Sequence, residues 1–147
     1  MSVAVDVSRD GVRIALSEQR VRDIVRAVCR RERVSEALIS VAFIRNAAIA
    51  RMNKEFLGHK GATDVITFEL EDAPARSSRR TIVGDIYIAP DVARRNAMEN
   101  GVGVREELTR LVVHGTLHVL GYTHAEGSHR TTGDMWHRQE EILASIV

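Results

Sequence analysis

The sequence is poor in several features that define large classes of proteins. Cys29 is the single cysteine, which excludes an internal disulfide framework. No stretch approaches the roughly 18 apolar residues that a membrane-spanning helix needs. The first ten residues, MSVAVDVSRD, lack the basic region and apolar run of a signal peptide. We therefore expect a cytoplasmic protein with no membrane segment.

The sequence also lacks a strong charge of either sign. Lys and Arg total 21 and Asp and Glu total 20, which gives a formal net charge of +1. An RNA substrate would therefore have to be held by a local basic patch, because no global basic field is present. The 147 residues contain no internal repeat and no low-complexity tail, and about 68–70% of the unfolded surface is buried at this length. We expect residues 1–147 to form one domain.

Hydrophobic periodicity predicts an α+β fold, with a small mixed sheet of about four strands packed with about five helices. The expected strands are Val3–Val7, Leu38–Ile44, Val65–Phe68 and Ile82–Ala89, with a further extended piece at 12–16. The expected helices are 18–32 after Ser17 as N-cap, 46–56, 91–100, 105–120 and a closing helix from about Trp136.

Residues 114–124, HGTLHVLGYTH, carry the clearest chemical signal. On a helix, His114 and His118 lie about one turn apart on the same face. Gly121 is suited to end that helix, and His124 would then return to the same point. Two histidines at this spacing also arise by chance, but the third behind a glycine favours a metal site. Three imidazoles leave a fourth position open, as in catalytic sites that bind one zinc ion.

The spacing H-x-x-x-H-x-x-G-x-x-H also occurs in metzincin proteases, which carry Glu after the first histidine. That Glu is the general base of the protease, and here the position is Gly115. The metal geometry would be kept while peptidase chemistry loses its base. A metallopeptidase that takes a base from elsewhere remains an alternative, with Glu126 as the nearest acidic candidate in the sequence.

Residues 114–124 resemble the signature H-G-x-L-H-x-L-G-Y-x-H of the YbeY family, bacterial metal-dependent endoribonucleases that mature ribosomal RNA. Residues 52–68, MNKEFLGHKGATDVITF, resemble the family's N-x-x-(Y/F)-R-G-x-x-x-x-T-D-V-(L/I)-(S/T)-F. The resemblance spans 43–143 and implies a zincin-like metal helix. It implies a zinc-dependent, single-strand-specific endoribonuclease that acts in 16S ribosomal RNA 3′-end maturation and ribosome quality control. The implied partners are precursor ribosomal RNA and the small ribosomal subunit.

Two positions depart from the family pattern. Leu57 stands where many members carry an Arg thought to contact phosphate, and Thr123 replaces an Asp before the third histidine. His59 and Lys60 follow closely after Leu57 and are our candidate catalytic residues, because either would supply the missing charge. The departure at Leu57 keeps a second alternative open, a ribosome-assembly factor whose zinc is structural.

Two further residues have two interpretations each. The stretch GDIYIAP resembles a strand of the family, expected at the sheet edge beside the metal helix. Its Asp85 either orients a ligand or histidine, or forms an ordinary hydrogen bond at a strand start. Met135 either lies under the metal site or packs in the core.

Overall fold

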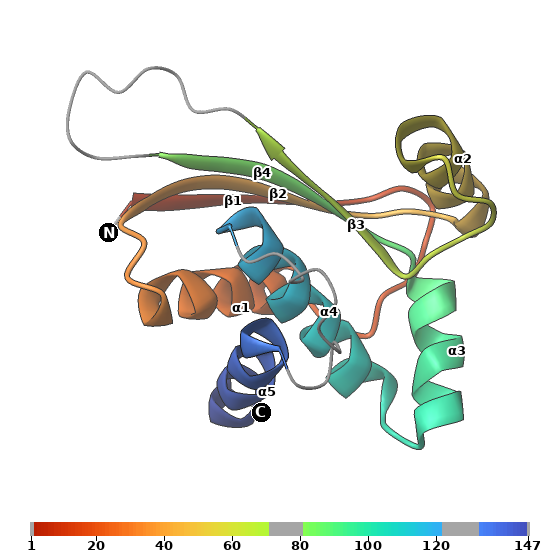
Figure 1. The fold of residues 1–147 in the computed structure, drawn as a ribbon. Coiled ribbons are helices and arrows are strands. Elements are labelled where there is room, and N and C mark those ends of the chain that lie inside the picture. The colour runs from red at the N-terminus through yellow and green to blue at the C-terminus, as the bar shows by residue number, and fades with distance from the viewer. Residues whose placement is uncertain (1, 71–80, 122–132, 147) are drawn as a thin grey trace.

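The fold is a sheet covered mainly on one face by helices, in a computed structural model that describes residues 2–70, 81–121 and 133–146 (Figure 1). The sheet order is β1-β2-β4-β3. Strands β1, β2 and β4 are parallel, and β3 pairs antiparallel with β4. The strand bounds are Ser2–Arg9 for β1, Glu36–Phe43 for β2, Val65–Leu70 for β3 and Ile82–Ile88 for β4. The predicted mixed sheet of four strands is confirmed.

The described part of the chain has five helices, as predicted. Their bounds are Glu18–Arg31 for α1, Asn46–Leu57 for α2, Pro90–Asn100 for α3, Val104–Val119 for α4 and Asp134–Ile146 for α5. Ser17 caps α1, since its hydroxyl oxygen accepts a hydrogen bond from the Arg20 amide at 3.0 Å. Residues 12–16, expected to be extended, form no strand. None of the helices that the structure describes has the length and apolar character needed to cross a membrane.

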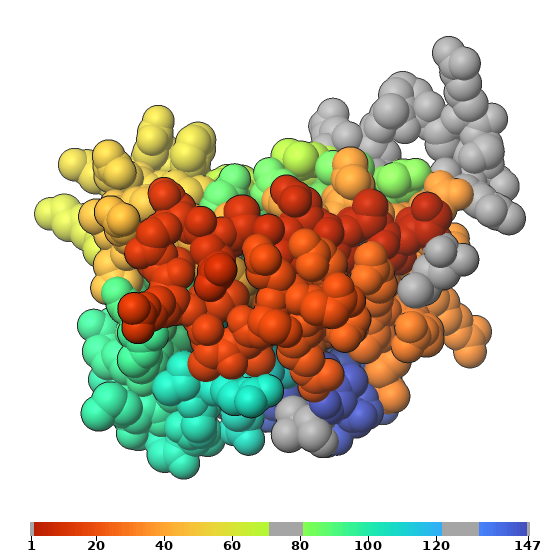
Figure 2. Space-filling model, turned by 180° about the vertical axis from the view of Figure 1, so that it is seen from behind, coloured from red at the N-terminus to blue at the C-terminus, as the bar shows by residue number. Residues whose placement is uncertain are grey.

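Helix α4 lies in the middle of the helical layer, against the sheet and between the other helices (Figure 1). Its position explains its composition, because α1, α3 and α5 all pack against it and leave little of it exposed. Seen from behind, β1 and α1, in red and orange, form much of the molecular surface (Figure 2). Helix α2 instead packs at one end of the sheet, where Phe56, Phe68 and Tyr87 form an edge-to-face aromatic row.

Two glycines allow α4 to approach β4 closely. A Cβ atom placed on Gly115 of α4 would lie 2.7 Å from Cγ2 of Ile86 on β4. A Cβ placed on Gly84 of β4 would collide with the side chain of Val119 on α4. The helix and the strand therefore each carry a glycine where the other presents a bulky side chain, Ile86 on β4 and Val119 on α4. This contact sets the height of α4, and of every side chain it carries, above the sheet.

Candidate active site

His114 and His118 stand out on α4 because they are half-buried while the other residues from 111 to 119 are buried. Their ring centroids lie 4.7 Å apart, and the ring planes meet at 69°. The predicted pair on one helix face, one turn apart, is therefore present. The helix ends as expected, because Gly121 follows its last turn with φ of 108°, in the left-handed region. The predicted third histidine, His124, lies outside the described residues.

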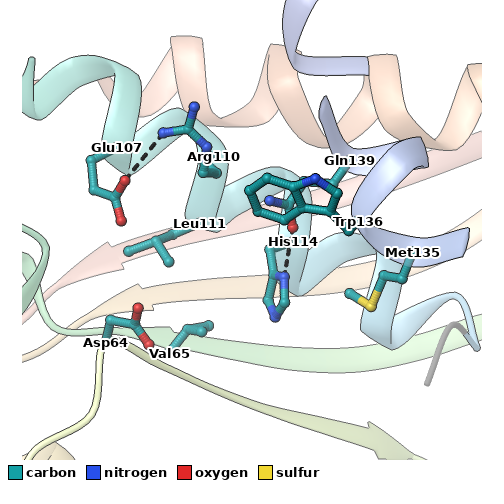
Figure 3. A pocket seen from close by; sticks show the side chains of 9 residues that line it. All are labelled: Asp64, Val65, Glu107, Arg110, Leu111, His114, Met135, Trp136 and Gln139. Carbon is teal, nitrogen blue, oxygen red and sulfur yellow. Dashed lines mark hydrogen bonds and ion pairs between the residues drawn. The ribbon is translucent and has the colours of Figure 1, made fainter. Parts of the chain in front are cut away.

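His114 forms part of the wall between two cavities. The first, which we call the α5 cavity, has a volume of about 310 Å³ and lies between the start of β3, α4 and α5 (Figure 3). The second, the β3 cavity, has a volume of about 290 Å³, and His118 also lines it. The α5 cavity is lined by Asp64, Val65, Glu107, Arg110, Leu111, His114, Met135, Trp136 and Gln139. The β3 cavity is lined by Leu57, Thr63, Asp64, Val65, Ile66, Thr67, His114 and His118.

The segment before β3 is held by three hydrogen bonds. Asn53 is 6% exposed, and its side-chain amide donates to the Gly61 carbonyl at 3.0 Å. The Asp64 carboxylate accepts from the Asn96 side chain of α3 at 3.2 Å, and its backbone carbonyl accepts from the Ala89 amide at 2.9 Å. These bonds give Asn53 and Asp64 of the 52–68 motif a structural role, and those of Asp64 hold it where both cavities meet.

A row of polar contacts connects His114 to the start of α4. Nδ1 of His114 lies 2.6 Å from Oε1 of Gln139, and Nε2 of Gln139 donates to Oε2 of Glu140 at 3.1 Å. Glu140 also accepts from Nε of Arg110 at 3.1 Å. Arg110 reaches back to Glu107 at 3.2 Å, as Figure 3 shows. Helices α4 and α5 are therefore joined by a continuous polar row beside the histidine pair.

The two acidic residues of this row have pKa values that move in opposite directions. Burial raises the pKa of Glu107, and the hydrogen bond and charge of Arg110 oppose this only in part. Burial also disfavours the ionised form of Glu140, but the hydrogen bonds from Arg110 and Gln139 prevail and lower the pKa of Glu140. Arg110 is therefore held mainly by Glu140, and Glu107 is the less readily ionised acid that lines the α5 cavity.

The two predicted catalytic residues, His59 and Lys60, are exposed in the segment that follows α2. Neither is among the described residues that line the two cavities, although Leu57 lines the β3 cavity. Their role in charge neutralisation therefore stays a prediction. The hydrophobic Leu57 occupies the wall beside both histidines, which is where the family pattern suggests an Arg.

The strand expected at the sheet edge is instead internal. Strand β4 lies between β2 and β3, and β3 is the edge strand beside α4. Asp85 of β4 accepts a hydrogen bond from the Ser40 hydroxyl at 2.6 Å and lies on the face opposite to Gly84 and Ile86, which contact α4. This favours the ordinary hydrogen-bonding interpretation of Asp85. Met135 is 4% exposed, belongs to the core and also lines the α5 cavity.

Sequence reasoning missed Gln139, Glu107 and Trp136 as residues of the site. Gln139 is 3% exposed and shares the buried side of α5 with Met135 and Ile142. A polar residue at helical spacing on an apolar stripe was the available signal. Glu107 lies in the first turn of α4, where an acidic residue favours the helix dipole, and it is also 6% exposed and lines the α5 cavity.

The donor chemistry of the described residues fits part of a zinc site. Neutral imidazoles are preferred zinc ligands, and the two on α4 lie on the same helix face beside one cavity. Within residues 2–70, 81–121 and 133–146, no group of three or more His, Cys, Asp or Glu side chains is placed to hold a metal ion. A complete site would therefore need a ligand from elsewhere in the chain, where His124 remains the predicted candidate.

Comparison with known proteins supports one family. The model of the family described as Endoribonuclease YbeY matches residues 5–147. A protein named Endoribonuclease YbeY from Syntrophus aciditrophicus is 30% identical over 143 residues, covering 97% of this chain and 89% of the relative. One from Frankia alni is 34% identical and covers 97% of this chain and 82% of the relative. One from Moorella thermoacetica is 39% identical over 117 residues, covering 76% and 74%.

A solved structure shares the fold. The solution structure of TM1509 from Thermotoga maritima aligns with a TM-score of 0.62 and 21% sequence identity, covering 97% of this chain and 88% of that one. This likeness supports the arrangement of strands and helices described above.

Proposed function

This chain is a member of the YbeY family of endoribonucleases, and we propose that it cleaves single-stranded RNA with the help of one zinc ion. The observation that carries the proposal is the pair His114 and His118, half-buried on an otherwise buried helix and lining the β3 cavity together. His124 would complete the ligand set. When bound, zinc would supply Lewis acidity and lower the pKa of a water molecule toward about 7.

The charges around the cavities support a bound cation. Asp64 lines both cavities, and Glu107 lines the α5 cavity. Arg110 is the one Lys or Arg among the described lining residues, and it is already paired with Glu106, Glu107 and Glu140. A phosphodiester approaching His114 would therefore meet carboxylates. Among the cavity-lining residues that the structure describes, it would meet no Lys or Arg that is not already paired with an acidic side chain. Zinc at the histidines, together with His59 or Lys60, would supply the positive charge that phosphoryl chemistry requires.

The chain's own residues would position the substrate. The β3 edge strand and the wall that contains Leu57 and Thr67 border the histidines on the side away from α5. An extended, unpaired strand of RNA fits along such a wall more readily than a duplex, whose bases are stacked inside. We further propose a cytoplasmic role in 3′-end maturation of 16S ribosomal RNA and in ribosome quality control, with precursor ribosomal RNA and the small subunit as partners.

The zinc requirement is tested with purified wild type, His118→Ala and His137→Ala. His137 is exposed on α5, so its variant is a control for loss of a histidine. Zinc content is measured by elemental analysis, and cleavage is followed with single-stranded and duplex RNA of the same sequence. We expect wild type and His137→Ala to retain zinc and cut the single strand, and His118→Ala to lose both properties. RNA cleavage that persists after chelation would refute the zinc requirement.

A second candidate function is favoured by Leu57. A hydrophobic side chain in the β3 cavity wall contacts no phosphate, which suits a ribosome-assembly factor with structural zinc. For this candidate, the purified protein would cut no RNA, and His114→Ala would lose zinc while still binding the small subunit. A metallopeptidase with a base at position 115 does not fit, because that position faces Ile86 of the sheet. The alternative with a base from elsewhere stays a prediction, since its candidate Glu126 lies outside the described residues.

A further inference from the structure

Gln139 of α5 makes the shortest described polar contact to the histidine pair. Its Oε1 lies 2.6 Å from Nδ1 of His114, and the amide side chain is almost completely buried, at 3% exposure. The two residues are 25 positions apart and belong to different helices. A buried amide in this place has little freedom to choose other partners, so its orientation constrains the imidazole.

Glu140 settles which end of the Gln139 amide faces the imidazole. Nε2 of Gln139 donates to Oε2 of Glu140 at 3.1 Å, and a carboxylate only accepts hydrogen bonds. Oε1 of Gln139 must therefore face His114, and this oxygen also only accepts. It follows that Nδ1 of His114 carries the hydrogen. In a neutral imidazole the lone pair then resides on Nε2, on the far side of the ring from Gln139.

Arg110 holds the Glu140 carboxylate in place. Its guanidinium donates through Nε to one carboxylate oxygen at 3.1 Å and through a terminal nitrogen to the other at 3.3 Å. This two-point contact is directional and fixes the plane of the carboxylate. The contacts that orient His114 therefore run through Gln139 and Glu140 to the guanidinium of Arg110, one turn earlier on α4.

We propose that Gln139 is a positioning residue that holds the hydrogen of His114 on Nδ1 and so presents Nε2 to the metal ion. This inference rests on the proposed zinc site. Hydrogen-bond partners of ligating histidines commonly fix the tautomer and ring orientation, and their loss weakens metal affinity by about 10- to 100-fold. Here the direct acceptor is a neutral amide, and the carboxylate of Glu140 stands one step behind it.

The first test compares zinc affinity in wild type, Gln139→Leu and the exchange variant Gln139→Glu/Glu140→Gln, by competition with a chromophoric chelator at one pH. Leucine keeps much of the volume and removes the acceptor, so we expect affinity about 10- to 100-fold weaker. The exchange variant keeps the net charge and restores an acceptor at position 139, so we expect affinity within about threefold of wild type. A merely structural role of Gln139 would not produce this recovery. His137→Ala is the control for substitution on α5.

The second test needs no variant. Long-range ¹H–¹⁵N NMR of metal-free wild type reports which ring nitrogen of His114 is protonated, and we expect Nδ1. Protonation at Nε2 instead, or unchanged zinc affinity in folded Gln139→Leu, would refute the role of Gln139 and leave the proposed function intact. A wild-type protein that binds no zinc would refute the proposed cofactor and this role together.

Discussion

Replacement of Gly115 by Ala tests whether the contact between α4 and β4 sets the position of the site. The added Cβ would lie 2.7 Å from Cγ2 of Ile86 and 3.4 Å from its Cγ1 and Cδ1. Ile86 is fully buried, and its Cγ2 is attached to a branched Cβ, so it has little room to move. Overpacking of this kind costs about 1–3 kcal/mol.

Helix propensity acts in the opposite direction. Ala is favoured over Gly inside a helix by about 1 kcal/mol. The expected net effect of Gly115→Ala is therefore a loss of about 1 kcal/mol in the free energy of unfolding, within a range of about 0–2 kcal/mol.

The same substitution in an Ile86→Ala background should have the opposite sign. Removal of Cγ1, Cγ2 and Cδ1 leaves space for the new methyl group, so Gly115→Ala should then stabilise by about 1 kcal/mol. Ile86→Ala alone should cost about 2–5 kcal/mol, which a domain of typical stability tolerates at low temperature. All four proteins are compared by urea denaturation. An equal effect of Gly115→Ala in both backgrounds would show that Ile86 does not limit the approach of α4.

Three further outcomes are expected. Leu57→Arg should raise the rate of RNA cleavage about tenfold, because it places a cation in the β3 cavity wall. The control Leu38→Arg, at an exposed position of β2, should leave the rate unchanged, and equal effects of the two variants would contradict the role of the wall. The pKa of Glu140 is lowered in the folded protein, so its pairing with Arg110 stabilises the fold above the usual carboxyl pKa, and this stability is lost as the pH falls. Glu140→Gln should therefore be less stable than wild type in urea denaturation near neutral pH, and the difference should vanish in acid. A difference that stays constant with pH would refute this linkage. Burial raises the pKa of Cys29 to about 11, so iodoacetamide should modify the thiol of the native protein roughly 100-fold more slowly than that of the unfolded protein. Mass spectrometry follows the modification, and rapid labelling of the native protein would contradict the burial.

The features predicted correctly from sequence depend on local spacing. Ser17 caps α1 because a side-chain oxygen before a helix finds an orphan amide within three residues. His114 and His118 share a face because any helix places residues four apart on one side. Both predictions required only the helix itself, with no knowledge of what packs on it.

The features missed depend on contacts between distant parts of the chain. The interior place of β4 follows from pairing with β2, about 45 residues earlier, which no local pattern encodes. Gly115 was interpreted by the chemistry it lacks, but its physical reason is the close approach of Ile86. Glu107 lies in the first turn of α4, but its place in the α5 cavity wall depends on residues far away in the sequence, such as Asp64 and Gln139.

The location of Gln139 on α5 has a consequence for the order of events during protein synthesis. The ribosome releases α4 before α5, so both α4 histidines leave the exit tunnel while the residue that contacts His114 is still to come. A nascent chain stopped before Asp134 would hold His114 without this acceptor. The contact that orients His114 therefore forms only after α5 has followed α4 out of the ribosome, and shorter fragments lack it.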